Sequence, residues 1–187
     1  MKKMRRHDRE MSEEFAYQVI DEAPYGVMGL CLDEPYTVPL SIVRLAEDDK
    51  NLYFHSAKEG RKLQAGHQVS LTFVSKHSAP SLYSDAEVQA MIDQKEIGKI
   101  ARTIYTTEFA SAHVLGRLVE VQDEAIKAKV LQAIANKYTP QYAKFAEPII
   151  KASVNNTAIY KIEVSEIRGK QKKLDHKTGE EIKGDAD

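Results

Sequence analysis

Cysteine is nearly absent from this chain of 187 residues. Its one cysteine, Cys31, lies in the apolar run from Val27 to Leu32. A lone thiol cannot form a disulfide within its own chain, so the cysteine content does not indicate an oxidising compartment. We predict that Cys31 is a small buried hydrophobic residue in a strand.

Long apolar runs and an excess of charge of either sign are also missing. No stretch approaches the roughly 20 apolar residues of a membrane-spanning helix. The basic start of the chain, residues 1–10, is not followed by the apolar segment of a signal peptide. The 27 Lys and Arg residues nearly balance 28 Asp and Glu residues, which argues against a protein that coats nucleic acid. We therefore expect a cytoplasmic protein with no membrane or nucleic-acid partner.

Several sequence motifs that indicate a particular cofactor or reaction do not occur. The sequence has no Gly-x-Gly-x-x-Gly, no P-loop and no Gly-x-Ser-x-Gly. The histidines away from position 55 are scattered, without the spacing of metal ligands: His7, His67, His77, His113 and His176. We expect no metal site.

Alternation of apolar and polar residues predicts a chain rich in β-strands. The predicted strands cover residues 26–32, 36–43, 52–55, 69–73, 110–121 and 158–164. Pro39 has no N–H for a ladder hydrogen bond, so its strand should have an edge or a bulge there. About six antiparallel strands with few crossovers favour a barrel, because closure removes exposed edges. The predicted fold class is mainly β, a β-barrel with peripheral helices, in a single domain spanning residues 1–187.

Capping signals mark the helices that should surround the barrel. Ser12 can cap a helix that Pro24 ends. Ser84 and Glu87 have the spacing of a capping box, within a helical insertion predicted at about residues 76–103.

The clearest helical pattern follows Asp123, and a second short helix is predicted over residues 141–150. The apolar stripe of the first helix comprises Ile126, Val130, Leu131, Ile134 and Tyr138. The charged tail, residues 169–187, has no apolar pattern and is predicted to be mobile.

A strand that runs into a polar turn carries the clearest chemical signal. Ser56, Lys58, Arg61 and Lys62 lie within one short segment. A hydroxyl, cationic groups and the N–H groups of a helix start together suit a phosphate. The alternative is a solvated basic turn, since serine and lysine are common in turns. The residue types alone leave both interpretations open.

Four segments together resemble a known family. They read "MRRHDRE", "PYTVPLSIV" (residues 35–43), "YFHSAKEGRKL" (residues 53–63) and "YKIEVSEIRGKQKK" (residues 160–173). In this order they are similar to the nitroimidazole-resistance (Nim) type FMN-binding proteins of the pyridoxamine phosphate oxidase superfamily. The resemblance implies an FMN-binding split barrel.

The resemblance also assigns roles around the phosphate. Ser56, Arg61 and Lys62 would hold the FMN phosphate, with Lys58 in the same cluster. His55 stands where the family often has a histidine near the flavin, which makes it the candidate catalytic residue. A structural histidine at a strand end is the alternative for His55.

Other positions would contact the rest of the cofactor. The segment Val38, Pro39, Leu40 and Ser41 would meet the flavin ring and ribityl chain. The family has a Thr-x-Tyr-x-Ser element, which corresponds here to residues 107–111. Phe109 replaces the usual tyrosine, and Ser111 retains the serine hydroxyl.

Lys170 would lie near the phosphate or the partner subunit, although Lys170, Lys172 and Lys173 can also be read as a solvated basic tail. The insertion at 76–103 is longer than the family leads us to expect, which leaves the shape of the substrate pocket open.

The expected activity follows from the same resemblance. An FMN-dependent oxidoreductase would reduce a small electron-poor substrate, such as a nitro compound, with electrons from a nicotinamide donor. Family members of this type are usually homodimers with the flavin between subunits. The alternatives are a carrier or sensor that binds flavin or haem without catalysis, and a barrel that has lost its cofactor.

Overall fold

A computed structural model describes residues 4–31, 34–58 and 67–185. The strands are β1 (Glu10–Met11), β2 (Gly26–Cys31), β3 (Pro35–Leu40), β4 (Val43–Leu45), β5 (Asp48–Ser56), β6 (Gln68–Ser78), β7 (Glu108–Val121), β8 (Ala158–Leu174) and β9 (Glu181–Ile182). The α-helices are α1 (Glu13–Glu22), α2 (Asp85–Asp93), α3 (Ile97–Thr103), α4 (Glu124–Tyr138) and α5 (Ala146–Ser153). Single 3₁₀ turns lie at His7–Arg9, Ala143–Phe145 and Val154–Asn156.

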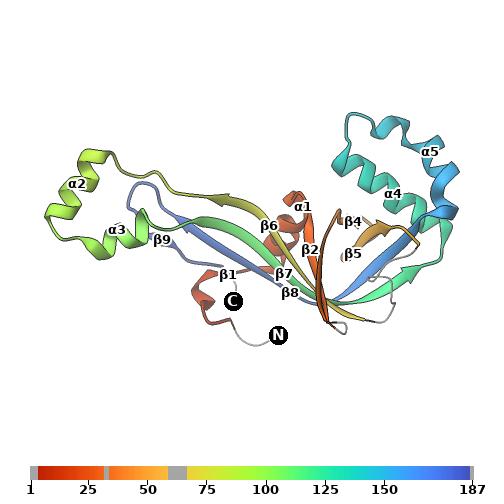
Figure 1. The fold of residues 1–187 in the computed structure, drawn as a ribbon, viewed down its shortest axis with the longest axis horizontal. Coiled ribbons are helices and arrows are strands. Elements are labelled where there is room, and N and C mark those ends of the chain that lie inside the picture. The colour runs from red at the N-terminus through yellow and green to blue at the C-terminus, as the bar shows by residue number, and fades with distance from the viewer. Residues whose placement is uncertain (1–3, 32–33, 59–66, 186–187) are drawn as a thin grey trace.

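The strands form one strongly curled antiparallel sheet (Figure 1). Its order is β3-β2-β6-β7-β8-β5-β4, and β1 and β9 pair with the long β8. The terminal strands β3 and β4 are consecutive in the chain, with only Ser41 and Ile42 between them. This short link spans at most about 11 Å from Leu40 to Val43, so the two ends of the sheet order must lie close together. The predicted class, a mainly β split barrel with peripheral helices, is confirmed.

Proline takes the position that its missing N–H predicts. Pro39 lies opposite Val27 in β3, the strand that ends the sheet order next to β2. The expectation of a sheet edge at Pro39 is confirmed, since an edge strand can leave one row of backbone groups outside the ladder.

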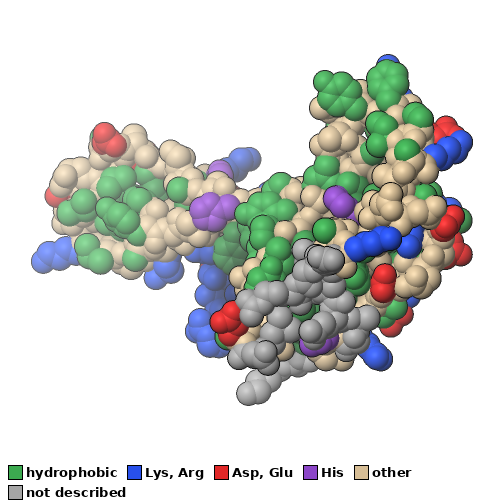
Figure 2. Space-filling view, turned by 45° about the vertical axis from the view of Figure 1, so that its right-hand side comes forward, with side chains coloured by type: hydrophobic (Ala, Val, Ile, Leu, Met, Phe, Trp, Pro, Cys, Tyr) green, Lys and Arg blue, Asp and Glu red, His purple; other side chains and the backbone are tan. Residues whose placement is uncertain are grey.

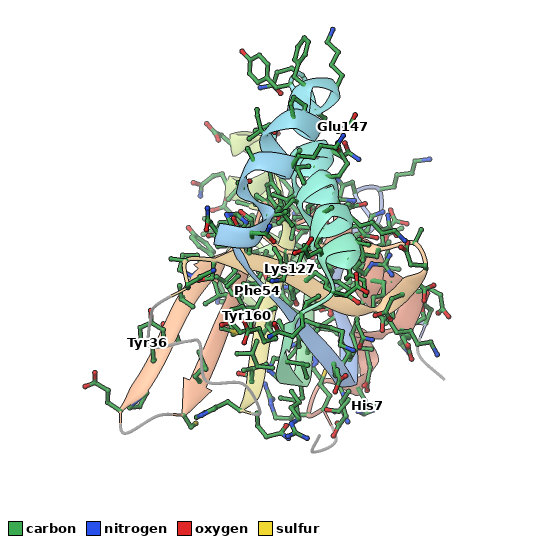
Figure 3. The ribbon with its side chains drawn as sticks, turned by 90° about the vertical axis from the view of Figure 1, so that its right-hand side faces the viewer. His7, Tyr36, Phe54, Lys127, Glu147 and Tyr160 are labelled. Atoms are coloured by element: carbon green, nitrogen blue, oxygen red, sulfur yellow. The ribbon has the colours of Figure 1, made fainter. Side chains whose placement is uncertain are left out.

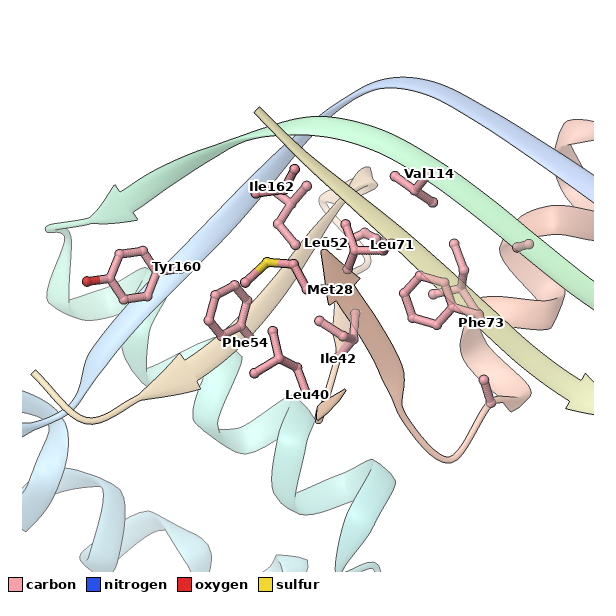
Figure 4. Close-up of a cluster of buried hydrophobic side chains, with 14 of the residues drawn as sticks. Met28, Leu40, Ile42, Leu52, Phe54, Leu71, Phe73, Val114, Tyr160 and Ile162 are labelled. Carbon is pink, nitrogen blue, oxygen red and sulfur yellow. The ribbon is translucent and has the colours of Figure 1, made fainter. Parts of the chain in front are cut away.

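The barrel interior holds the main hydrophobic core (Figure 4). Its members come from alternate positions of the strands, where one face of each strand turns inward. They include Met28, Leu40, Leu52, Phe54, Leu71, Phe73, Val114, Tyr160 and Ile162. Phe54 and Tyr160 stack with ring centroids 5.4 Å apart. Viewed from the end of the molecule that carries α4 and α5, the two rings lie close together inside the barrel (Figure 3).

Cys31 lies in β2 as predicted, but it is exposed and not buried. The strand alternates between buried and outward positions, with Met28 and Leu30 turned into the core. Cys31 has the opposite parity, so its side chain falls on the outer face. The prediction of a buried thiol was wrong because the apolar run did not reveal which face each residue occupies.

Helix α4 begins as its cap predicts, and Asp123 accepts a hydrogen bond from the Ile126 amide at 3.0 Å. Val130 is fully buried in a second core with Val43 and Tyr53. Of the predicted stripe, Val130 is buried, Leu131, Ile134 and Tyr138 are half-buried, and Ile126 is 36% exposed. Ile126 lines an open hollow with Leu45, Tyr53 and Val121, which leaves its side chain accessible.

The predicted insertion forms an arm at one end of the elongated molecule (Figure 1). The capping box is confirmed, with the Ser84 amide donating to Glu87 Oε2 at 2.7 Å. Strand β6 extends to Ser78, so the helical part begins later than residue 76. Figure 2 shows hydrophobic side chains gathered on this arm. Ile92 of α2 and Ile97 of α3 are exposed.

The segment after Gly169 is more regular than its composition suggests. Strand β8 continues to Leu174 because it pairs with β7 as far as Lys172, which lies opposite Phe109, and with β9 at Lys173 and Leu174. Strand β9 then pairs back on β8, and Glu181 forms an ion pair with Arg9. The tail therefore contains strand pairing that its composition did not predict, because backbone pairing does not require an apolar pattern. Its mobility stays a prediction.

No helix in the described parts of the chain combines the length and the apolar character needed to cross a bilayer.

Candidate functional site

The end of β5 carries a buried hydroxyl without a hydrogen-bond partner. Ser56 lies opposite Ala158 of β8 and is 7% exposed. Within the described part of the chain, nothing donates to or accepts from its Oγ. An unsatisfied buried polar group costs about 1–3 kcal/mol, so it calls for an explanation such as a bound group.

The predicted cationic partners of Ser56 follow directly in the sequence. Lys58 is exposed, two residues beyond Ser56. Arg61 and Lys62 lie outside the described residues. The roles of Ser56, Lys58, Arg61 and Lys62 at a phosphate stay predictions.

His55 lies between the buried Phe54 and Ser56, and its side chain is exposed. Since neighbouring residues of a strand point to opposite faces, His55 and Ser56 cannot face the same way. Its catalytic role stays a prediction.

The segment predicted to meet the flavin ring ends beside the same strand. Leu40 is buried, Val38 and Ser41 are half-buried, and Pro39 is exposed. In the β4–β5 ladder Val43 lies opposite Tyr53. Ser41 lies two residues before Val43, and His55 lies two residues after Tyr53, so both lie just outside this ladder. We call the Val38–Ser41 segment and the end of β5 together the β5-end cluster.

Ser111 and Lys170 belong to a second group of residues, on the β7–β8 ladder, where they lie opposite each other. The Ser111 hydroxyl donates to the Lys170 carbonyl at 3.4 Å, and the Lys170 ammonium lies 5.7 Å from the Phe109 ring centroid. They border a hollow of about 250 Å³, here called the β7–β8 hollow. It is lined by Met4, Thr72, Ser111, Ala112, His113, Arg168 and Lys170.

Two residues of this hollow, His113 and Arg168, were not predicted from the sequence. They lie opposite each other, two positions from Ser111 and Lys170, and so share their face of the sheet. The two-residue periodicity of a strand, counted from Ser111 and from Lys170, could have identified both residues from the sequence. Burial, and then the nearby Arg168 charge, lower the pKa of His113, which favours its neutral form.

One chain does not bring the two groups together. Ser56 lies opposite Ala158 and Ser111 lies opposite Lys170, so the two positions are twelve steps apart along β8. At about 3.3 Å per residue this is on the order of 40 Å along the strand. Ser111 and Lys170 are therefore not neighbours of Ser56 within the same chain.

Metal ligands do not gather in either group. In the described ranges, no cluster of three or more His, Cys, Asp or Glu side chains could hold an ion.

Comparison with known proteins places this geometry in a wider context. A family model described as pyridoxamine 5′-phosphate oxidase matches residues 12–171. A search of curated proteins found no match.

Three solved structures illustrate the shared fold. A candidate 5-nitroimidazole antibiotic resistance protein from Bacteroides thetaiotaomicron is 21% identical, with 86% of this chain and 84% of that chain covered and a TM-score of 0.60. The flavocytochrome Anf3 from Azotobacter vinelandii is 18% identical, with 91% and 72% covered and a TM-score of 0.66. An FAD and heme binding protein from Mycobacterium smegmatis is 14% identical, with 88% and 73% covered and a TM-score of 0.66. At these identities the likeness concerns the fold.

Proposed function

The chain belongs to the pyridoxamine 5′-phosphate oxidase family, and from this membership we propose that it is a flavin-dependent oxidoreductase of the Nim type that binds FMN. The observation that carries the proposal is the buried Ser56 hydroxyl, which has no partner among the described residues. A phosphate oxygen would satisfy it, and the exposed Lys58, two residues further along the chain, would add a cation. Arg61 and Lys62 complete the proposed phosphate site.

The rest of the β5-end cluster suits the other parts of the cofactor. The Val38–Ser41 segment would lie along the ring and ribityl chain, and His55 would stand beside them. Bound flavin supplies the electron transfer, while the protein supplies binding, orientation and electrostatics. Two of the similar solved structures are described as a flavocytochrome and as an FAD and heme binding protein, which supports a flavin in this fold.

The proposed substrate is a small electron-poor molecule such as a nitro compound. The structural similarity to a candidate 5-nitroimidazole resistance protein supports this choice. We propose a nicotinamide donor that visits the site transiently, because the paired strands are antiparallel and a dinucleotide-binding fold uses parallel ones.

Two separated groups of predicted cofactor residues support a homodimer. A second copy whose β7–β8 hollow faced the β5-end cluster of the first would bring Ser111 and Lys170 to the flavin. Light scattering is expected to report the mass of two chains. A single-chain mass across a wide concentration range would contradict the dimer.

The function is tested by the spectrum of the purified protein, followed by turnover. We expect oxidised-flavin absorption, loss of that absorption on adding NADH or NADPH, and its return with a nitro acceptor. A flavin that neither nicotinamide reduces would favour the carrier or sensor, and a Soret band would favour its haem-binding form. Protein that neither carries nor takes up flavin would contradict the proposal.

A further inference from the structure

Neither of the two neighbouring β-ladders includes the junction between β3 and β4, and side chains form hydrogen bonds with its backbone instead. The β2–β3 ladder ends at Leu40 and the β4–β5 ladder begins at Val43, so Ile42 falls between them. Its side chain is 1% exposed in the barrel core. A buried backbone at such a position needs other hydrogen-bond partners.

Tyr138, the last residue of α4, is a partner of both backbone polar groups of Ile42. The Ile42 amide donates to the Tyr138 phenol oxygen at 2.8 Å. The same phenol donates to the Ile42 carbonyl at 2.9 Å. Burial raises the pKa of Tyr138, which keeps the phenol protonated and able to donate.

Lys137 extends this arrangement to a third element. Its ammonium donates to the Ile42 carbonyl at 3.1 Å and to the Ile20 carbonyl, near the end of α1, at 3.0 Å. One turn of α4 therefore ties α1 to the β3–β4 junction. Ser41 is the last residue of the segment proposed to contact the flavin ring. It immediately precedes Ile42, whose backbone Tyr138 and Lys137 bind.

We propose that Tyr138, assisted by Lys137, is a positioning residue that sets where the Val38–Ser41 segment meets the flavin ring. The inference rests on the proposed function and adds a residue that the cofactor does not touch. A segment fixed by hydrogen bonds at one end keeps its backbone in place before the ligand arrives, and preorganisation of this kind improves affinity. The junction adjoins the segment proposed to contact the flavin ring, which FMN and riboflavin share. A change at Tyr138 should therefore lower the affinity for both ligands equally.

The test compares Tyr138→Phe with Tyr17→Phe, in apo protein and in flavin titrations. Tyr17 is a matched control because its phenol donates to the Lys50 carbonyl at 3.1 Å, away from the junction. In Tyr138→Phe we expect FMN and riboflavin each to bind about tenfold more weakly, the equivalent of one or two hydrogen bonds. Hydrogen exchange at the Ile42 amide should also accelerate, and the visible bands of flavin at saturation should shift. Tyr17→Phe should leave all three readouts unchanged.

The possible failures are distinguishable. If the wild type binds flavin and Tyr138→Phe binds both ligands as tightly, the positioning role is overturned while the proposed function stands. Weaker FMN with unchanged riboflavin would also overturn it, because that pattern belongs to the phosphate end. A wild type that binds no flavin would overturn the proposed function and this inference together.

Discussion

Replacing Phe54 with alanine is expected to lower the free energy of unfolding by about 3–5 kcal/mol. The Phe54 side chain is 0% exposed and stacks on Tyr160, so its loss leaves a cavity in the barrel core and removes a ring contact. Equilibrium urea denaturation of the flavin-free protein measures the change. Flavin must be absent because a ligand that binds only the folded state would add its own stabilisation.

Phe145 provides a matched control on the surface. Its side chain is 57% exposed, so Phe145→Ala should change the free energy of unfolding by no more than about 0.5 kcal/mol. Equal effects of the two substitutions would contradict the position of Phe54 in the core. If Phe54→Ala does not fold, Phe54→Leu offers a smaller cavity, and it should still be less stable than Phe145→Leu.

Arg61→Ala is expected to weaken FMN binding by about one to two orders of magnitude, since charge-assisted hydrogen bonds contribute roughly 1.5–3 kcal/mol each. The planar guanidinium of Arg61 can bind two phosphate oxygens at once. Riboflavin has the same ring without the phosphate, so its affinity should not change. Fluorescence titration of both ligands measures the difference. The exposed Arg117 on β7 is the control, and Arg117→Ala should bind both ligands as the wild type does.

Ser56→Ala tests the same proposed phosphate site at a residue that the structure describes. Removing a buried hydroxyl that has no partner among the described residues should leave the flavin-free protein as stable as before, or more stable by up to about 1 kcal/mol. The same change should weaken FMN and spare riboflavin. Tight FMN binding retained in both Arg61→Ala and Ser56→Ala would refute the phosphate assignment even if the protein were yellow.

Local chemistry was enough to predict most elements of this protein. Ser12, Ser84 and Asp123 cap helices where the sequence predicted caps, because a side-chain oxygen reaches an N–H only a few residues ahead. Alternation located most of the strands, and Pro39 marked a sheet edge, because both signals lie within a few neighbouring residues.

Features that depend on the distant surroundings of a residue were not predictable. Cys31 and Ile126 are as apolar as their buried neighbours, yet both are exposed, because burial depends on which strand or helix covers a face. The charged segment after Gly169 continues β8 because β7 is long enough to pair with it.

The candidate site divides in the same way. The sequence by itself contained the local pattern around Ser56 that predicts a phosphate segment, because that pattern lies in the order of residue types along a strand and a turn. Only the tertiary structure showed that the Ser56 hydroxyl is buried and that Tyr138 holds Ile42 from 96 positions away. It also separated Ser111 and Lys170 from Ser56 along β8. Distances of this kind follow from how a curled sheet closes, and closure depends on the pairing of all its strands at once.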